Sequence, residues 1–241
     1  MTSNSNPSKT INYTKIVDLS HVIDSNIPLW PSDPPVEFES VANLEKDGYY
    51  LRRFSIGEHS GTHINAPNSF HANGAGIDTY PAASLVVSAV VIDVQRQTAA
   101  NADYALTKLD VLNWEQQYQR IPVGSVVLLY TGWQAKWQDG RAFFNQDAQG
   151  GWHFPGFDGD TTRFLLEERG IAGVGIDTHG VDPGQDETFA TNKQVLEKQR
   201  IVLENLTNLD QLPPIGTTLA IGILRLKNGS GTPVSVLAFV P

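Results

Sequence analysis

The chain lacks cysteine altogether, and its 241 residues include a single methionine. Without cysteine it can form no disulfide, thiolate zinc site, iron–sulfur cluster or cysteine nucleophile. Any metal ion must be held by histidine, carboxylate, amide or water, which is typical of catalytic rather than structural sites. The lack of cysteine is also consistent with the cytoplasm, which is the location we expect.

Positive charge is scarce as well, because 17 Lys and Arg stand against 26 Asp and Glu, a formal net charge of −9. An acidic chain is a poor match for a phosphate backbone or an anionic membrane surface, so we expect neither nucleic acid nor membrane as partner. No apolar run is long enough to span a bilayer, and the polar first residues do not resemble a signal peptide. A Gly-rich phosphate loop and a Gly-x-Ser-x-Gly elbow are both missing, so nucleotide binding and serine-hydrolase chemistry lack support.

What is present fits one globular domain, with 40% hydrophobic and 18% charged residues. We expect a disordered tail over residues 1–10 and a single domain over residues 11–241. The almost continuously apolar runs at 84–94 and 125–130 predict buried strands.

Helical spacing of apolar residues predicts a helix at 104–118. Asp160 as N-cap and Gly170 as C-cap glycine predict a short helix at 160–170, and residues 186–199 also look helical. Strands are expected at 15–20, 51–58, 172–178, 200–205, 218–226 and 235–240. The strand–helix–strand order around 160–178 implies parallel pairing, and we predict an α/β domain rich in sheet. Residues 131–157 form a long connection, either a lid or an interface arm.

The segment 59–71 holds three of the six histidines. Its β-branched residues favour a strand, on which His59, His63 and Asn65 would share one face with Gly61 between them. Neutral imidazole is the commonest protein metal ligand, so paired histidines indicate a metal or catalytic site. The alternative is two hydrogen-bonded histidines on a polar strand face. Trp30, in the proline-rich loop 28–35, is either a wall of a substrate site or a packing contact.

Four segments, taken in order, resemble the cyclase-like metal hydrolase family, which includes bacterial kynurenine formamidase and isatin hydrolase. They are Asp18-Leu-Ser-His with loop 28–35, His59-Ser-Gly-Thr-His63-Ile-Asn65-Ala-Pro67, Gly175-Ile-Asp-Thr178 with Asp182-Pro183, and Val202-Leu-Glu204-Asn-Leu206. The resemblance implies a swivelling β/β/α fold, a homodimer or homotetramer, and hydrolysis of a small cyclic or acyclic amide. It also implies that His59, His63 and Glu204 bind a divalent metal, zinc or manganese, as a single ion.

Three positions depart from the family pattern. Asn65 stands where the family has Asp, Ser69 where it has His, and Asn192 where it has a later His. An amide oxygen can coordinate a cation but neutralises none of its charge, so metal affinity should fall. His71 and His179 are the spare histidines, and either could act as general base.

Three classes of function follow. The leading hypothesis is a metal-dependent hydrolase of a small amide, imide or lactone, in which His71 shuttles the proton and Asn65 orients the water. The second is a metal-free isomerase, dehydratase or cyclase, in which Asn65 and Ser69 donate hydrogen bonds to an oxyanion. The third is a non-catalytic binding protein on the same scaffold.

Overall fold

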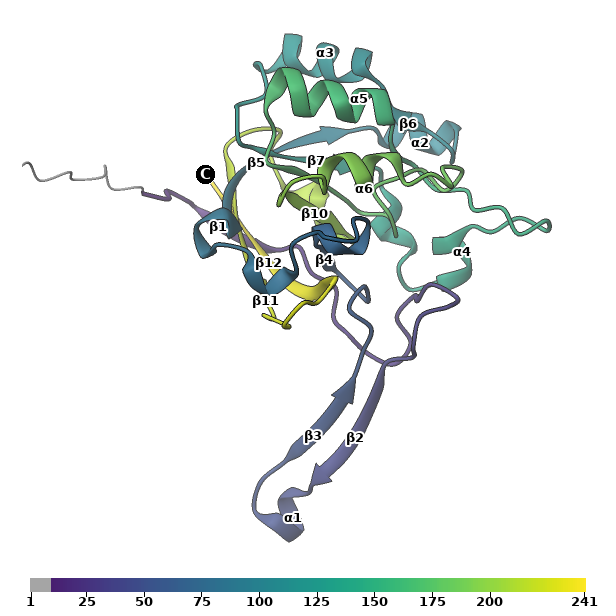
Figure 1. Ribbon diagram of the computed structural model, residues 1–241, viewed down its shortest axis with the longest axis vertical. Coiled ribbons are helices and arrows are strands. Elements are labelled where there is room, and N and C mark those ends of the chain that lie inside the picture. Colours follow the sequence, from purple (N-terminus) through teal and green to yellow (C-terminus); the bar gives the residue numbers. More distant parts are fainter. Residues whose placement is uncertain (1–9) are drawn as a thin grey trace, which may run out of the picture.

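The computed structural model describes residues 10–241 (Figure 1), so all but the last residue of the predicted tail lies outside the described residues. The strands are β1 (Lys15–Asp18), β2 (Glu37–Ala42), β3 (Leu51–Ser55), β4 (His63–Asn65), β5 (Val86–Asp93), β6 (Ala105–Leu106), β7 (Val126–Tyr130), β8 (Gly156–Phe157), β9 (Gly173–Ile176), β10 (Ile201–Glu204), β11 (Thr217–Ile223) and β12 (Gly231–Val240). The α-helices are α1 (Leu44–Asp47), α2 (Gln95–Ala100), α3 (Lys108–Gln117), α4 (Gly140–Phe144), α5 (Gly159–Phe164) and α6 (Ala190–Val195). Short 3-10 turns are η1 (Pro67–Ser69), η2 (Ile77–Thr79), η3 (Ala82–Leu85), η4 (Trp133–Lys136) and η6 (Leu209–Gln211), and η5 (Leu165–Arg169) is a π-turn.

One mixed sheet organises the fold. Its strands follow the order β1-β12-β11-β5-β7-β9-β10-β4, and β4 also pairs with β12. The extra pairing closes seven of the strands into a barrel, with β1 attached to the outside of β12. The pairs β5–β7, β7–β9 and β9–β10 are parallel, and the others in this sheet are antiparallel. The predicted α/β class and the parallel pairing are therefore confirmed.

The alternation of side chains along the central strands separates two hydrophobic cores. On β5, Ala89 and Val91 belong to the core inside the barrel, whereas Val90 and Ile92 belong to a second core. Helices α3, α5 and α6 lie over the second core (Figure 1). Because both faces of β5 are buried, its sequence is continuously apolar rather than alternating. Each fully buried aliphatic side chain stabilises the fold by about 1.5–3 kcal/mol.

The helix expected at 160–170 begins earlier and ends differently. Its N-cap is Asp158, whose side chain accepts a hydrogen bond from the backbone N–H of Thr161. The predicted cap, Asp160, lies in the first turn instead. The last turn widens into η5 and ends at Gly170, which has a left-handed φ of 63° as predicted for a C-cap glycine.

Residues 131–157 are not a structureless connection, because they contain η4, α4 and β8. Trp133, Trp137 and Phe143 are buried together in a third core. The indole N–H of Trp133 donates to the carbonyl oxygen of Phe143 at 2.7 Å. These aromatic residues thus fold the segment onto the body of the protein.

An antiparallel hairpin formed by β2 and β3 projects away from the body, with α1 at its tip (Figure 1). Phe38 on β2 is paired in register with Phe54 on β3, and both side chains are exposed, to 37% and 58%. The sequence predicted the second strand but not the hairpin.

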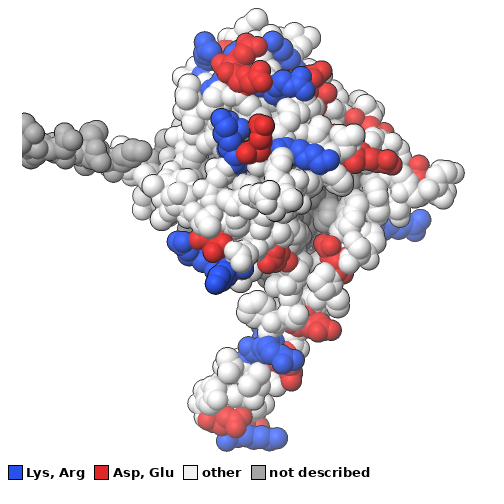
Figure 2. All heavy atoms as spheres, viewed as in Figure 1, with Lys and Arg blue, Asp and Glu red and all other residues white. Residues whose placement is uncertain are grey.

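The surface of the viewed face carries both signs of charge, interspersed rather than gathered in one patch (Figure 2). Within residues 10–241, no helix combines the length and the apolar character of a membrane span.

Candidate functional site

A cavity of about 480 Å³ lies where the loop around Trp30, the histidine segment and residues 179–192 meet the end of β10. His59, His63 and Glu204, the three predicted metal ligands, all line it. Two of the other predicted residues, Asn65 and Ser69, line it as well. Segments far apart in the sequence thus converge on one cavity.

His63 and Glu204 form a buried pair on the floor of the cavity. They are register partners on the antiparallel strands β4 and β10, and His63 Nε2 lies 3.0 Å from Glu204 Oε2. Their side chains are 2% and 7% exposed. The Nδ1 atom of His63 lies 2.9 Å from the carbonyl oxygen of Gly61. Both ring nitrogens of His63 therefore face oxygen atoms of neighbouring groups, which fixes the orientation of the ring.

Glu204 is ionised despite its burial. Burial by itself would raise the pKa of Glu204, but the hydrogen bond and charge of His63 outweigh it. Further donors are the backbone N–H of Val181, at 3.0 Å from Oε1, and the amide of Asn192, at 3.2 Å. Together these interactions lower the pKa of Glu204 to about 2.

His59 does not lie on a strand face with His63. The chain turns at Gly61, which has a left-handed φ of 63°, and β4 begins only at His63. The predicted strand over this segment is therefore too long. The turn nevertheless brings the two rings edge to face, with centroids 5.3 Å apart. The Nδ1 atom of His59 lies 2.8 Å from Asn65 Oδ1, and Nε2 lies 2.9 Å from Ser230 Oγ.

His179 lines the same cavity and stacks on Trp30 with ring centroids 4.9 Å apart. Its Nδ1 atom is buried and has no hydrogen-bond partner among the described residues. Burial lowers the pKa of His179 to about 4, so the ring is neutral at physiological pH. The structure therefore places one of the two spare histidines in the cavity.

His71, the other spare histidine, is not brought to the cavity. The turn η1 (Pro67–Ser69) redirects the chain before it reaches His71. His71 is partly exposed, and its Nε2 lies 2.9 Å from the carbonyl oxygen of Lys193. The Ser69 hydroxyl donates to the backbone carbonyl oxygens of Ala66 and Ser230, so its proton is not available for an oxyanion.

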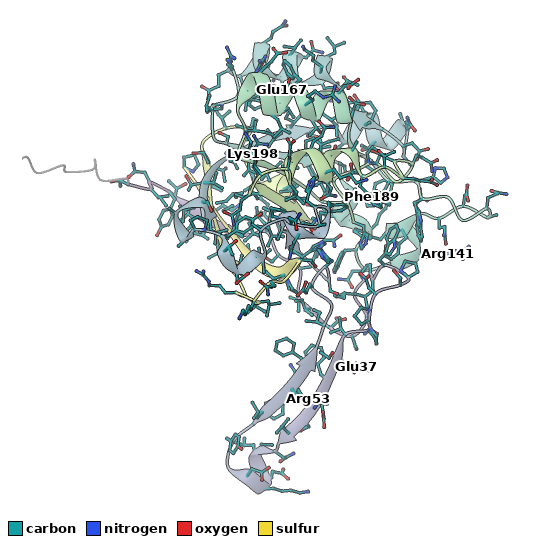
Figure 3. The ribbon with its side chains drawn as sticks, in the orientation of Figure 1. Glu37, Arg53, Arg141, Glu167, Phe189 and Lys198 are labelled. Atoms are coloured by element: carbon teal, nitrogen blue, oxygen red, sulfur yellow. The ribbon has the colours of Figure 1, made fainter. Side chains whose placement is uncertain are left out.

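Aromatic side chains form one wall of the cavity. Trp30 lies 4.5 Å from Trp152 between ring centroids, and both line the cavity with Phe154. Phe189, which precedes α6, also lines it, and its side chain is labelled in Figure 3. Trp30 therefore lines the cavity and also packs against the core that contains Trp133 and Trp137, so its role as a substrate wall stays a prediction.

The donor set does not fit a divalent metal as it is arranged. A catalytic zinc site commonly has three protein ligands with free lone pairs. His63 Nε2 and Glu204 Oε2 are adjacent, but both nitrogens of His59 face other polar groups. Among residues 10–241, no group of three or more His, Asp or Glu side chains is placed to hold a metal ion. The predicted ligands share a cavity without forming a ligand triad.

Comparisons with known proteins agree with this architecture. The family model Cyclase, described as "Putative cyclase", matches residues 17–183. The chain is 31% identical over 245 residues to isatin hydrolase from Roseibium aggregatum, covering 94% of this chain and 92% of the relative. It is 27% identical over 224 residues to kynurenine formamidase from Bacillus anthracis, covering 92% and 95%. The solved structure of isatin hydrolase A from Ralstonia solanacearum superposes with a TM-score of 0.90 at 33% identity, covering 94% of this chain and 92% of that one.

Proposed function

The chain belongs to the cyclase family, and on that premise we propose that it hydrolyses a small cyclic amide, imide or lactone, or an aryl formamide. The observation that carries the proposal is the cavity itself, in which an aromatic wall faces the buried His63–Glu204 pair. The relatives support a C–N bond as the target, since they are an isatin hydrolase and a kynurenine formamidase.

The cavity suits a flat, partly aromatic substrate. The wall formed by Trp30 and Trp152 offers stacking surface, and a cavity of about 480 Å³ is of the size that holds a small ligand. A substrate stacked there would direct its carbonyl group toward the polar floor. The His63 ring on that floor then stabilises the negative charge that develops on the carbonyl oxygen.

His179 is the residue we assign as general base. The ring is neutral and lines the cavity. Its Nδ1 atom has no hydrogen-bond partner among the described residues, so it is free to accept a proton. In the hydrolysis, His179 accepts a proton from the attacking water as the new C–O bond forms. It then returns this proton to the leaving nitrogen as the C–N bond breaks, so the reaction consumes one water and leaves the ring unchanged.

Glu204 acts as a positioning residue. Its carboxylate oxygen Oε2 lies 3.0 Å from His63 Nε2 and fixes the direction of the ring. The backbone N–H of Val181 donates to Glu204 and fixes this carboxylate in turn. These contacts position both side chains before any substrate binds.

A second candidate function is a metal-free isomerase, dehydratase or cyclase on the same scaffold. The arrangement of His59 favours it, because both ring nitrogens face neighbouring side chains rather than a metal. Such an enzyme would use the same neutral His179 as base and the same His63 ring to stabilise an enolate or oxyanion.

A substrate panel tests the proposed function. Purified protein is incubated with isatin, formanilide, a cyclic imide and an aromatic lactone, and the products are identified by mass spectrometry. Hydrolysis adds one water to the mass of a ring substrate and splits formanilide into aniline and formate, whereas isomerisation leaves the mass unchanged and dehydration removes one water. Turnover with addition of water supports the hydrolase, and a folded protein that turns over none of the panel contradicts it.

We also propose that the projecting hairpin docks a second copy of this chain. Its exposed Phe38–Phe54 pair provides apolar surface that a homodimer would bury. A cytoplasmic location, which the absence of cysteine favours, stays a prediction.

A further inference from the structure

Two amide side chains meet at the centre of the cavity wall. Asn65, at the end of β4, donates from Nδ2 to the Oδ1 atom of Asn192 on α6 at 3.0 Å. The two residues are 2% and 4% exposed. This amide bridge joins the histidine segment to the helix across a large separation in sequence.

Two carboxylates fix the direction of the bridge. Asn192 Nδ2 donates to Asp182 Oδ2 at 2.9 Å and to Glu204 Oε1 at 3.2 Å. Ionised carboxylates only accept hydrogen bonds, so the amide nitrogen of Asn192 must point toward them. Its oxygen then faces Asn65, and that oxygen requires a donor.

The orientation of the two amides also determines which atom faces His59. Since Asn65 Nδ2 donates to Asn192, Asn65 Oδ1 is the atom that faces Nδ1 of His59, at 2.8 Å. An amide oxygen only accepts, so His59 must carry a proton on Nδ1. The other nitrogen, Nε2, lies 2.9 Å from Ser230 Oγ, and this hydroxyl donates its own proton to Glu58 Oε2 at 2.7 Å. The carboxylates of Asp182 and Glu204 thus place a proton on Nδ1 of His59 through two amides, and Nε2 is occupied by Ser230.

From this network we propose that the Asn65–Asn192 amide bridge takes the place of a metal ion, and that the cavity works without a bound divalent cation. Neither amide brings negative charge, and each amide oxygen already accepts a hydrogen bond. The bridge supplies what an ion would otherwise supply structurally, a fixed connection between the histidine segment and α6 that reaches the carboxylates of Asp182 and Glu204 through Asn192. The inference rests on the proposed function only in taking this cavity as the reaction site.

Metal content and the ring tautomer test the proposal without reference to activity. Wild-type protein, purified without chelators after growth with added Zn²⁺ and Mn²⁺, is analysed by elemental mass spectrometry and titrated calorimetrically with each ion. Nitrogen-15 NMR of the imidazoles, with His59 assigned by comparison with His59→Gln, reports the tautomer. We expect no stoichiometric metal and a proton on Nδ1 of His59. Stoichiometric Zn²⁺ or Mn²⁺, or a His59 ring without a proton on Nδ1, would overturn the proposal.

A double variant supplies the reverse test. Asn65→Asp with Asn192→His exchanges the bridge for a carboxylate and an imidazole, and we expect it to bind Zn²⁺ stoichiometrically. The matched control is Asn73→Asp, an exposed position nearby, which should bind none. A folded double variant that binds no metal would contradict the proposal, and the wild-type measurements decide the matter if it does not fold.

The two proposals fail separately. A metal-free wild-type protein with an Nδ1–H ring supports the bridge even where the substrate panel shows no turnover. Such a result would contradict only the proposed hydrolysis.

Discussion

His63 Nε2 lies 3.0 Å from Glu204 Oε2, and the two residues face each other across the antiparallel strands β4 and β10. Because both side chains are buried, replacing one of them leaves the other buried without its hydrogen-bonded partner, which is energetically costly. We expect Glu204→Gln to lower the free energy of unfolding by about 3 kcal/mol, measured by urea denaturation. The double variant with His63→Gln should lose less than the sum of the two single losses.

A surface ion pair is the matched control for that experiment. Arg53 and Glu39 form an ion pair on the hairpin with side chains 75% and 60% exposed, and Figure 3 labels Arg53 there. Arg53→Gln should change the free energy of unfolding by less than about 1 kcal/mol. Equal losses at both pairs would contradict the assigned role of burial.

The base assignment predicts a pH profile. The pKa of His179 is lowered to about 4, and only the neutral ring can accept a proton. The contribution of this residue to kcat/KM is therefore full at neutral pH and is lost as the pH falls through about 4. His179→Gln should reduce kcat at pH 7 by about 100-fold or more.

His71→Gln tests the same assignment from the other side. His71 lies outside the cavity, so its replacement should leave kcat within about twofold of wild type, as for surface changes away from a site. A loss at His71 with none at His179 would reverse the assignment.

The aromatic wall predicts a binding effect. Trp30→Ala removes stacking surface, so KM should rise about tenfold with little change in kcat. Trp30→Phe keeps an aromatic face and should recover most of the affinity. A fall in kcat alone, at unchanged KM, would show that Trp30 acts elsewhere than in substrate binding.

The hairpin predicts a concentration-dependent dimer. Phe54→Glu places a charge on the exposed apolar pair with Phe38 and should dissociate the dimer, as measured by analytical ultracentrifugation. Val123→Glu, at an 84% exposed position on the body, is the control and should leave the assembly unchanged. A wild-type monomer at all concentrations would contradict this docking role.

Most of the fold could be predicted from the spacing of hydrophobic residues along the sequence. The apolar runs that became β5 and β7 were predictable because a strand buried on both faces has no polar positions. The hairpin of β2 and β3 was not, because its exposed strands carry no burial pattern to read. The turn at Gly61 was missed because a glycine beside the β-branched Thr62 fits a strand as well as a left-handed turn.

The site residues that lie in family motifs could be predicted from the sequence. The contacts between them that depend on the tertiary structure could not. The segments carrying His63 and Glu204 were assigned through the resemblance, and the sheet register brings them together. The Asn65–Asn192 bridge depends on contacts across 127 residues, which no local pattern encodes. The choice between His71 and His179 likewise required knowing where η1 turns the chain.

Ring opening of isatin is the most direct test of the claim that the cavity around His63 and Glu204 is a hydrolytic site. Wild-type protein and Glu204→Gln are assayed side by side, with product detected by mass spectrometry and folding checked by circular dichroism. We predict that wild type forms the water adduct and that Glu204→Gln is at least about 100-fold slower, because the charged floor is lost. Equal rates for the two proteins would contradict the account.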